Sequence, residues 1–252
     1  MNTDILIVVA ALNEADRISA TLAALALAFP GAPVWVADDG STDATPELAR
    51  AAGATVARSP RVIGKGQAMT AGVEAALASV DFLDGKARVR ARDGDPERSP
   101  AQSGEPSVAE PIVVLCDGDL GESAASLGPL ADAVRRGEAD LAVAAFVTRA
   151  GGGFGLAVGF ARWAIRRRCG LSTRAPIAGQ RALGARVLPD VLPFASGFGM
   201  EVGMTIDAVR AGRRVVEVEL DLAHRATGRT PAGFLHRARQ LADFIGVYLV
   251  RR

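Results

Sequence analysis

The chain of 252 residues has little cysteine and no excess of either charge. Cys116 and Cys169 lie far apart and form no CxxC pair, so neither a disulfide framework nor a zinc knuckle is expected. This cysteine usage fits a reducing cytoplasm. Lys and Arg number 29 against 28 Asp and Glu. The balance argues against a dedicated nucleic-acid binder, which would carry a basic excess.

A signal peptide and a long hydrophobic run are also missing. The apolar run at 5–12 follows no basic segment and ends at Asn13 and Glu14. No stretch approaches the roughly 18–20 apolar residues that cross a bilayer, which leaves surface attachment as the only membrane option. Hydrophobic residues make up 49% of the chain, enough for a large core. At this length one large α/β domain is as reasonable as two smaller ones.

Hydrophobic patterning predicts strands that alternate with helices. Short apolar runs predict strands at 4–11, 34–37, 54–57, 112–115 and 141–146, and alternation predicts a half-buried strand at 216–222. Helical spacing is found at 13–27, 66–77, 123–136, 156–169, 199–211 and 232–250. The pattern predicts an α/β fold with a mainly parallel sheet and helices on both faces. The stretch 85–110 has mixed charge and no Leu, Ile, Met or aromatic residue, so we expect a flexible surface insertion.

Polar clusters follow three of the predicted strands, where ligands bind in open α/β sheets. They are Leu12-Asn13-Glu14, Asp38-Asp39-Gly40-Ser41 and Asp117-Gly118-Asp119. Carboxylates gathered at one edge repel one another unless a cation or hydrogen-bond donors lie among them. The oxygens of Asp117 and Asp119 suit Mg²⁺ or Mn²⁺ bridging a diphosphate. An Asp-Gly-Asp turn without a metal is the alternative.

A glycine-rich loop with a lysine precedes the helix predicted at 66–77. Gly64-Lys65-Gly66 lets backbone N–H groups approach a ligand, and a helix N-terminus favours phosphate. The sequence has neither a Walker A nor a GxGxxG fingerprint, so the loop alone is weak evidence.

Taken together, these motifs resemble those of family 2 glycosyltransferases with the GT-A fold. The run VAALNE at 9–14 is followed by ADDGSTD at 37–43, GKGQA at 64–68 and DGD at 117–119. The resemblance implies a single GT-A domain over 1–252, with a nucleotide-sugar half at 1–146 and an acceptor half with a C-terminal helix at 147–252. The proline and tyrosine that usually open the first motif are missing here, which leaves any contact of that tyrosine ring in doubt.

The second half resembles the same family through three further motifs. They are AGQRA at 178–182, GFGME at 197–201 and LAHRATGR at 222–229. The last is similar to the segment that supplies a metal-binding histidine in glucosyl-3-phosphoglycerate synthases. Dolichyl- and polyprenyl-phosphate sugar transferases share the general layout of this region.

The resemblance assigns roles to individual residues. Donor contacts fall to Leu12, Asn13, Glu14, Asp39, Lys65, Asp117 and Gly118, and metal contacts to Asp119, His224 and Asp117. The acceptor would meet Gly179, Gln180, Arg181, Arg225 and Arg229, and the catalytic residues would be Glu201 and Asp119. The activity implied is metal-dependent transfer of a sugar from a nucleotide-sugar, with a UDP-sugar favoured.

Several of these residues also have an ordinary structural explanation. Glu201 also suits the first turn of a helix, where an acid complements the dipole. The arginines also suit an ordinary charged surface, and a lone histidine such as His224 is commonly a surface residue. A sugar nucleotidyltransferase and a non-catalytic nucleotide-sugar-binding module are the competing functions.

Acceptor, partners and stereochemistry stay open. The acceptor is a small phospho-acid or a polyprenyl phosphate, since arginine matches phosphate oxygens. A membrane surface touched by Phe160, Trp163 and the arginines at 166–168 competes with packing of that helix on the core, which is favoured. A second copy of the chain, forming a homodimer, is a further possible partner that the sequence leaves open. Inversion would need a base, for which Glu201 is the candidate, whereas similarity to the synthases favours retention.

Overall fold

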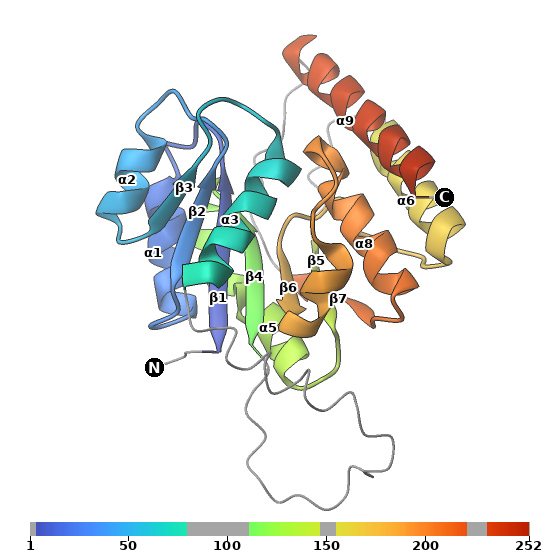
Figure 1. Ribbon diagram of the computed structural model, residues 1–252, viewed down its shortest axis with the longest axis horizontal. Coiled ribbons are helices and arrows are strands. Elements are labelled where there is room, and N and C mark those ends of the chain that lie inside the picture. Colours follow the sequence, from blue (N-terminus) through green and yellow to red (C-terminus); the bar gives the residue numbers. More distant parts are fainter. Residues whose placement is uncertain (1–3, 80–110, 147–154, 221–230, 252) are drawn as a thin grey trace, which may run out of the picture.

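The computed structural model describes residues 4–79, 111–146, 155–220 and 231–251, apart from the side chains of 146 and 231–239 (Figure 1). The insertion predicted at 85–110 lies outside the described residues, as do His224, Arg225 and Arg229. None of the described helices is both long and apolar enough to span a membrane.

A mixed seven-stranded sheet forms the centre of the fold. Its strands are β1 (Ile5–Ala11), β2 (Val34–Asp38), β3 (Thr55–Arg58), β4 (Ile112–Asp117), β5 (Leu141–Phe146), β6 (Arg181–Gly184) and β7 (Val215–Leu220). They are ordered β3-β2-β1-β4-β6-β5-β7, and β6 runs antiparallel to both of its neighbours while the other pairs are parallel. The predicted α/β fold with a mainly parallel, mixed sheet is confirmed.

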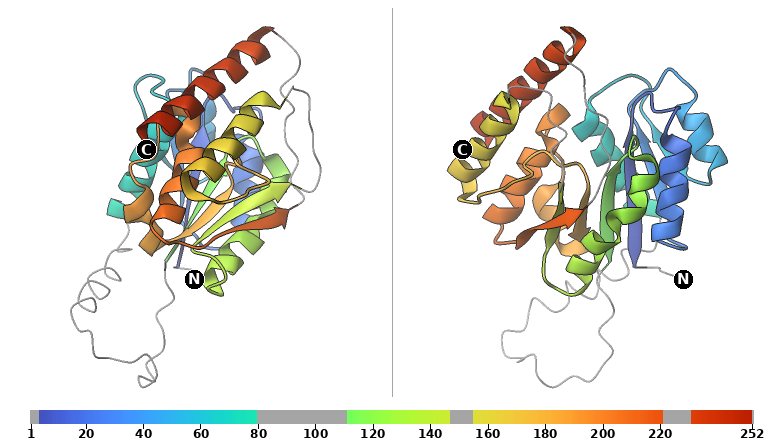
Figure 2. Two further views of the ribbon diagram at one scale, coloured as in Figure 1. Left: turned by 90° about the vertical axis from the view of Figure 1, so that its right-hand side faces the viewer. Right: turned by 180° about the vertical axis from the view of Figure 1, so that it is seen from behind.

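Helices cover both faces of the sheet (Figures 1 and 2). One face carries α1 (Ile18–Ala28), α2 (Thr45–Ala51), the 3₁₀ segment η2 (Gly121–Leu127) and α5 (Gly128–Arg135). The other carries α3 (Lys65–Ser79), η3 (Ala185–Val187), α7 (Leu188–Val191), η4 (Gly197–Gly199) and α8 (Met200–Arg210). Successive strand residues alternate between the faces, so Ile7 and Val9 pack on the first and Leu6 and Val8 on the second. Burial on both faces explains why β1 is apolar at every position.

Two predicted helices differ from the structure at their starts. The helix expected from 13 begins at Ile18, because residues 13–17 form a turn whose backbone N–H groups bond to side chains across the site. The helix expected over 123–136 is split into η2 and α5. Pro129 stands at the junction, where a residue without a backbone N–H suits the first turn of a new helix.

Two helices form an outer layer that does not touch the sheet core. Helices α6 (Leu156–Cys169) and α9 (Pro231–Val250) lie side by side and pack on α8 (Figures 1 and 2). From α6 the packed side is Ala161, Ala164 and Ile165. The expectation that α6 packs its aromatic side on the core holds only for Phe160, which packs against this cluster. Trp163 is 49% exposed and lies at a tilt against Tyr248 of α9, with ring centroids 4.8 Å apart. The reason is that α8 and α9, rather than the sheet, supply the surface that α6 covers.

The close approach of α3 to the sheet generates a stability prediction. A Cβ atom added at Gly72 would lie 2.7 Å from the Cβ of Ala37 on β2. We expect Gly72→Ala to lower the free energy of unfolding by about 1–3 kcal/mol, because the helix must move off the strand. Denaturant unfolding measures this. Gly246→Ala on α9, where a Cβ meets nothing within 4 Å, is the control and is expected to be neutral or slightly stabilising. Equal effects of the two substitutions would contradict the packing argument.

Candidate active site

The carboxyl ends of β1, β2 and β4 meet at one edge of the sheet. Ala10 of β1 lies opposite Ala37 of β2 and Asp117 of β4, and Ala11 lies opposite Asp38. The three polar clusters that follow these strands are therefore neighbours, as their positions in the sequence predict.

The first two clusters are tied together by side-chain hydrogen bonds. Asn13 has a left-handed backbone with φ of +56°, which asparagine tolerates better than most residues. Its side-chain oxygen accepts the N–H of Thr42 at 2.8 Å, and its own N–H donates to the hydroxyl of Ser41 at 2.9 Å. The N–H of Glu14 donates to the hydroxyl of Thr45 at 2.8 Å. These bonds fix the loop that presents Leu12, whose side chain is 38% exposed.

Asp39 holds the glycine-rich loop. Its carboxylate accepts the N–H of Ile63 at 2.7 Å and the N–H of Gly64 at 2.9 Å, and the residue is almost fully buried. The predicted contact with the base is untested. The structure instead shows that Asp39 positions the loop immediately before Lys65.

Lys65 joins both halves of the chain through its ammonium group. Nζ lies 2.6 Å from Oδ1 of Asp117 and 2.7 Å from Oε1 of Glu201. Burial by itself would lower the pKa of Lys65, but the two carboxylates outweigh it and raise the pKa above its ordinary value. Lys65 thus stays positively charged at any physiological pH. The sequence placed all three residues in the site but did not foresee this bridge.

The two residues before β6, Gly179 and Gln180, contact the carboxylate oxygen of Asp117 that Lys65 does not bind. Nε2 of Gln180 donates to Oδ2 of Asp117 at 2.8 Å. A Cβ at Gly179 would lie 2.4 Å from the same oxygen, so only glycine fits there without moving Asp117. Two of the predicted acceptor residues therefore shape the position of Asp117.

Arg181, a predicted acceptor residue, has no exposed surface in this structure. Its Nε–H donates to the carbonyl of Ala178 at 2.9 Å and its Nη1–H to the hydroxyl of Thr205 at 3.0 Å. Thr205 donates in turn to the carbonyl of Glu201 at 2.9 Å. Burial lowers the pKa of Arg181 to about 10, so it remains charged. Arg181 thus braces the first turn of α8.

Residues that the sequence did not single out hold the segment before Glu201. Asp243 of α9 accepts the N–H of Phe198 at 2.9 Å, and Gln67 of α3 accepts the N–H of Gly197 at 3.2 Å. The φ of Gly197 is +56°, and a Cβ there would lie 2.3 Å from Oδ2 of Asp243. In the sequence, only the glycines of the GFGME motif pointed to these contacts. They indicate that another part of the chain lies close to this backbone, but not which residue it is.

Asp117 and Asp119 are the carboxylates that the sequence predicts for a divalent-cation site. They flank Gly118, whose N–H bonds to the carbonyl of Ala10 at 2.8 Å, so both follow directly from the end of β4. Carboxylate oxygens are the donors that Mg²⁺ and Mn²⁺ prefer. The described residues contain no group of three His, Cys, Asp or Glu placed to hold a metal. The predicted third ligand, His224, lies outside them.

Comparisons with known proteins agree with this geometry. Residues 6–80 match the sequence model of glycosyl transferase family 2. No curated protein matches the chain. Solved structures of glucosyl-3-phosphoglycerate synthase from Mycobacterium tuberculosis are similar over 99% of this chain. The segment 6–80 therefore matches glycosyl transferase family 2, and the chain as a whole is similar in fold to this synthase.

Three complexes of that synthase illustrate the likeness. The complex with Mn²⁺, UDP-glucose and phosphoglyceric acid is 25% identical with a TM-score of 0.69, and 80% of its chain is covered. The complex with Mn²⁺, UDP and glucosyl-3-phosphoglycerate is 26% identical with a TM-score of 0.68 and the same coverage. The complex with Mg²⁺ and UDP is 27% identical with a TM-score of 0.68, and 79% of its chain is covered.

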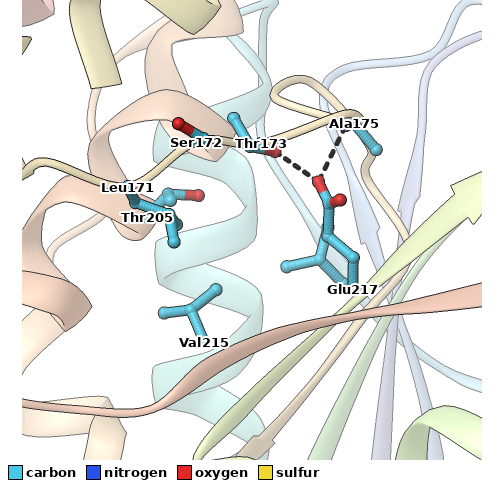
Figure 3. Close-up of a pocket in the computed structure, with 8 residues that line it drawn as sticks. Leu171, Ser172, Thr173, Ala175, Thr205, Val215 and Glu217 are labelled. Atoms are coloured by element: carbon cyan, nitrogen blue, oxygen red, sulfur yellow. Dashed lines mark hydrogen bonds between the residues drawn. The ribbon is translucent and has the colours of Figure 1, made fainter. Parts of the chain in front are cut away.

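This glycosyltransferase also has a cavity of about 120 Å³, whose lining includes Thr205, the hydrogen-bond partner of Arg181 (Figure 3). Its lining consists of Val143, Leu171, Ser172, Thr173, Ala175, Thr205, Val215 and Glu217. Burial alone would raise the pKa of Glu217, but hydrogen bonds from Thr173, Ala175 and Arg174 outweigh it and lower the pKa. The carboxylate thereby fastens the segment 171–175 to β7.

The contact between Gly179 and Asp117 generates the first prediction for the site. We expect Gly179→Ala to lower kcat/KM about 100-fold, because a shift of about 1 Å in a site residue costs that much. The free energy of unfolding should fall by only about 1–3 kcal/mol. Steady-state kinetics and denaturant unfolding measure the two effects. Gly128→Ala, where a Cβ meets nothing within 4 Å, should leave both unchanged. Full activity of Gly179→Ala would show that the position of Asp117 is not critical.

The lowered pKa of Glu217 predicts a pH-dependent stability. A carboxylate with a depressed folded-state pKa stabilises the protein above its unfolded pKa, and this is lost as the pH falls through the folded pKa. We expect Glu217→Gln to cost about 1–2 kcal/mol at pH 7 and progressively less below about pH 4. Urea unfolding across pH checks this. Glu47→Gln on α2, at a side chain 63% exposed, serves as the control. If the difference in unfolding free energy between the wild type and Glu217→Gln stayed the same at every pH, the carboxylate of Glu217 would not be the stabilising group.

Proposed function

We propose that this glycosyltransferase moves a sugar from a UDP-sugar to a small phosphorylated acceptor, with Mg²⁺ or Mn²⁺ as cofactor. One observation carries the proposal. The ammonium of Lys65 bridges Asp117, at the end of a donor-half strand, and Glu201, in the first turn of an acceptor-half helix. Both halves thus converge on one charged point, in a chain similar to a synthase solved with UDP-glucose and phosphoglyceric acid.

We assign the donor to the edge formed by β1, β2 and β4. Leu12, Asn13 and Glu14 would face the nucleoside, and Asp39 would hold the loop that carries Lys65. When bound, a divalent cation held by Asp119, Asp117 and His224 would offset the charge that develops on the leaving diphosphate. Gly118 keeps the intervening backbone close to β1, since a Cβ there would lie 3.0 Å from the carbonyl of Ala10.

Lys65 and Glu201 would act from neighbouring positions, because their charged groups lie 2.7 Å apart. The positive charge of Lys65 is preorganised beside the diphosphate position and so stabilises negative charge without reorientation. Glu201 would hold the acceptor hydroxyl, or take its proton if the reaction inverts. Gly179 and Gln180 would set the acceptor side of Asp117, while Arg225 and Arg229 would supply positive charge toward a phosphate. Arg181, which is fully buried, would act only by bracing the first turn of α8.

A small acceptor is favoured over a polyprenyl phosphate. The similar synthase has been solved with phosphoglyceric acid and with glycerol 3-phosphate, both small and phosphorylated. We further propose that residues 1–252 act as one GT-A domain and that the protein works in the cytoplasm, because both of its cysteines are free thiols.

The test is a donor and acceptor panel on the full chain. UDP-, GDP- and dTDP-glucose are each incubated with 3-phosphoglycerate or a polyprenyl phosphate, with and without Mn²⁺, and products are identified by mass spectrometry. We expect metal-dependent release of UDP together with a glucosylated 3-phosphoglycerate. Release of pyrophosphate would indicate a nucleotidyltransferase instead. Donor binding without any product would indicate a non-catalytic module.

A substitution within the same assay tests the metal assignment. Asp119→Ala should lower the transfer rate by at least about 100-fold, because the charge of the leaving group is no longer offset. The thermal unfolding midpoint should change little. Asp132→Ala on α5 replaces an aspartate whose side chain is 49% exposed and lies far from the site, and it should keep full activity. An unchanged rate in Asp119→Ala would remove this residue from the metal site.

A further inference from the structure

The near-neutral charge of the whole chain conceals two strongly basic segments. Residues 141–189 contain eight arginines and no aspartate or glutamate, and residues 222–252 contain six arginines and one aspartate. The rest of the chain is correspondingly acidic. Such asymmetry within one chain points to a partner of negative charge. The two segments include α6 and α9, which form the outer layer of the molecule (Figure 2).

Carboxylates do not neutralise the arginines of α6 within the described part of the chain. Arg162 donates to the backbone carbonyl of Arg174. Arg168 donates to the carbonyl of Tyr248 and lies over its ring, 3.7 Å from the centroid. Arg166 and Arg167 are exposed in the last turn of the helix. Arg166 and Arg167 therefore present their positive charge at the surface of this layer, while Arg162 and Arg168 are partly buried.

Exposed apolar side chains lie on the same two helices. Leu156 is 73% exposed and Trp163 49% on α6, while Leu249 is 50% and Val250 80% exposed on α9. Ile245, one turn before Leu249, is 40% exposed. The opposite sides of both helices are already used, because they pack on α8 through Ala161, Ile165, Phe244 and Val247. We call the outward side, formed by Leu156, Trp163, Arg166, Arg167, Ile245, Leu249 and Val250, the α6–α9 face.

We propose that the α6–α9 face binds the surface of an anionic lipid bilayer. Apolar side chains on one side of a helix enter the boundary between headgroups and acyl chains, and arginines beside them pair with lipid phosphates. Trp163 combines an apolar ring with a polar N–H, which suits that boundary. Each arginine near an anionic membrane contributes about 1 kcal/mol, so two of them change affinity about 30-fold.

The charge pattern favours lipid over the other occupants of an apolar face. A twofold dimer would place the same face against itself and bring Arg166 and Arg167 toward their own copies. The one carboxylate in the described part of this layer, Asp243, is engaged by the N–H of Phe198. A nucleic acid would meet the arginines but would leave the aliphatic side chains of Leu156, Leu249 and Val250 without a partner, since bases stack on aromatic rings.

The proposal does not depend on the proposed function, since it uses none of the residues placed in the active site. It differs from the expectation that α6 buries its aromatic side on the core. Trp163 and Phe160 cluster with Tyr248 between the two outer helices, which leaves the tryptophan ring half in solvent.

Vesicle flotation of the full chain tests the proposal. Vesicles of phosphatidylcholine alone are compared with vesicles containing 30 mol% phosphatidylglycerol, at low and at high salt. We expect at least tenfold stronger binding to the anionic vesicles, lost at high salt. Arg166→Gln with Arg167→Gln should weaken binding about 30-fold. Leu249→Ser with Val250→Ser should weaken it several-fold.

Matched variants elsewhere control for general effects. Arg50→Gln with Arg136→Gln removes two exposed arginines from other helices, and Leu27→Ser removes a leucine that is 79% exposed on α1. Both should bind like the wild type. Transfer activity toward a soluble acceptor verifies that every variant is folded and should be unchanged.

Three outcomes would overturn the proposal. Equal binding to neutral and anionic vesicles, or no binding, removes the lipid surface as partner. Sedimentation velocity that shows a dimer without lipid, dissociated by Leu249→Ser with Val250→Ser, assigns the face to a second copy of the chain. Binding of a labelled single-stranded oligonucleotide that anionic vesicles fail to displace assigns it to nucleic acid.

Discussion

The placement of one ammonium group between two carboxylates organises the active site. Lys65 begins α3, Asp117 ends β4 and Glu201 lies in the first turn of α8, so their contact fixes one helix on the strands and a second helix against the first. Each group is stable there because the others are charged. Without the cation, two carboxylates would be held close together in a partly buried place with no positive charge to offset their repulsion.

The fold was largely predictable because its signals are local. Continuous apolar runs marked the buried strands, and polar clusters marked the ends of β1, β2 and β4, where we place the donor. The antiparallel direction of β6 was not visible, because only four residues form the strand and their pattern is the same in either direction. The outer position of α6 was also missed, since an apolar side packed on α8 looks the same in sequence as one packed on a sheet.

Site residues were recognisable as types but not as contacts. Sequence motifs identified Lys65, Asp117 and Glu201 as site residues. The ionic contact between Lys65 and Glu201 could not be predicted, because the two residues are 136 positions apart in the chain. Asp243 and Gln67 escaped notice for the same reason, because each acts through one hydrogen bond to a distant backbone N–H. Gly179 was assigned to the acceptor, and its contact with Asp117 emerged only from the packing of β6 beside β4.

The reversed direction of β6 brings a segment from the second half of the chain to the edge formed by the ends of β1, β2 and β4. Because β6 runs against β4, its first residues arrive where β4 ends, so a segment from the second half of the chain is delivered to the donor edge without altering β1, β2 or β4. Gly179 and Gln180, directly before β6, are held by their contacts with Asp117, whereas the chain before Gly179 can change without disturbing β1, β2 or β4. Substitutions in that earlier segment can therefore alter the surroundings of this edge while the strands that form it stay unchanged.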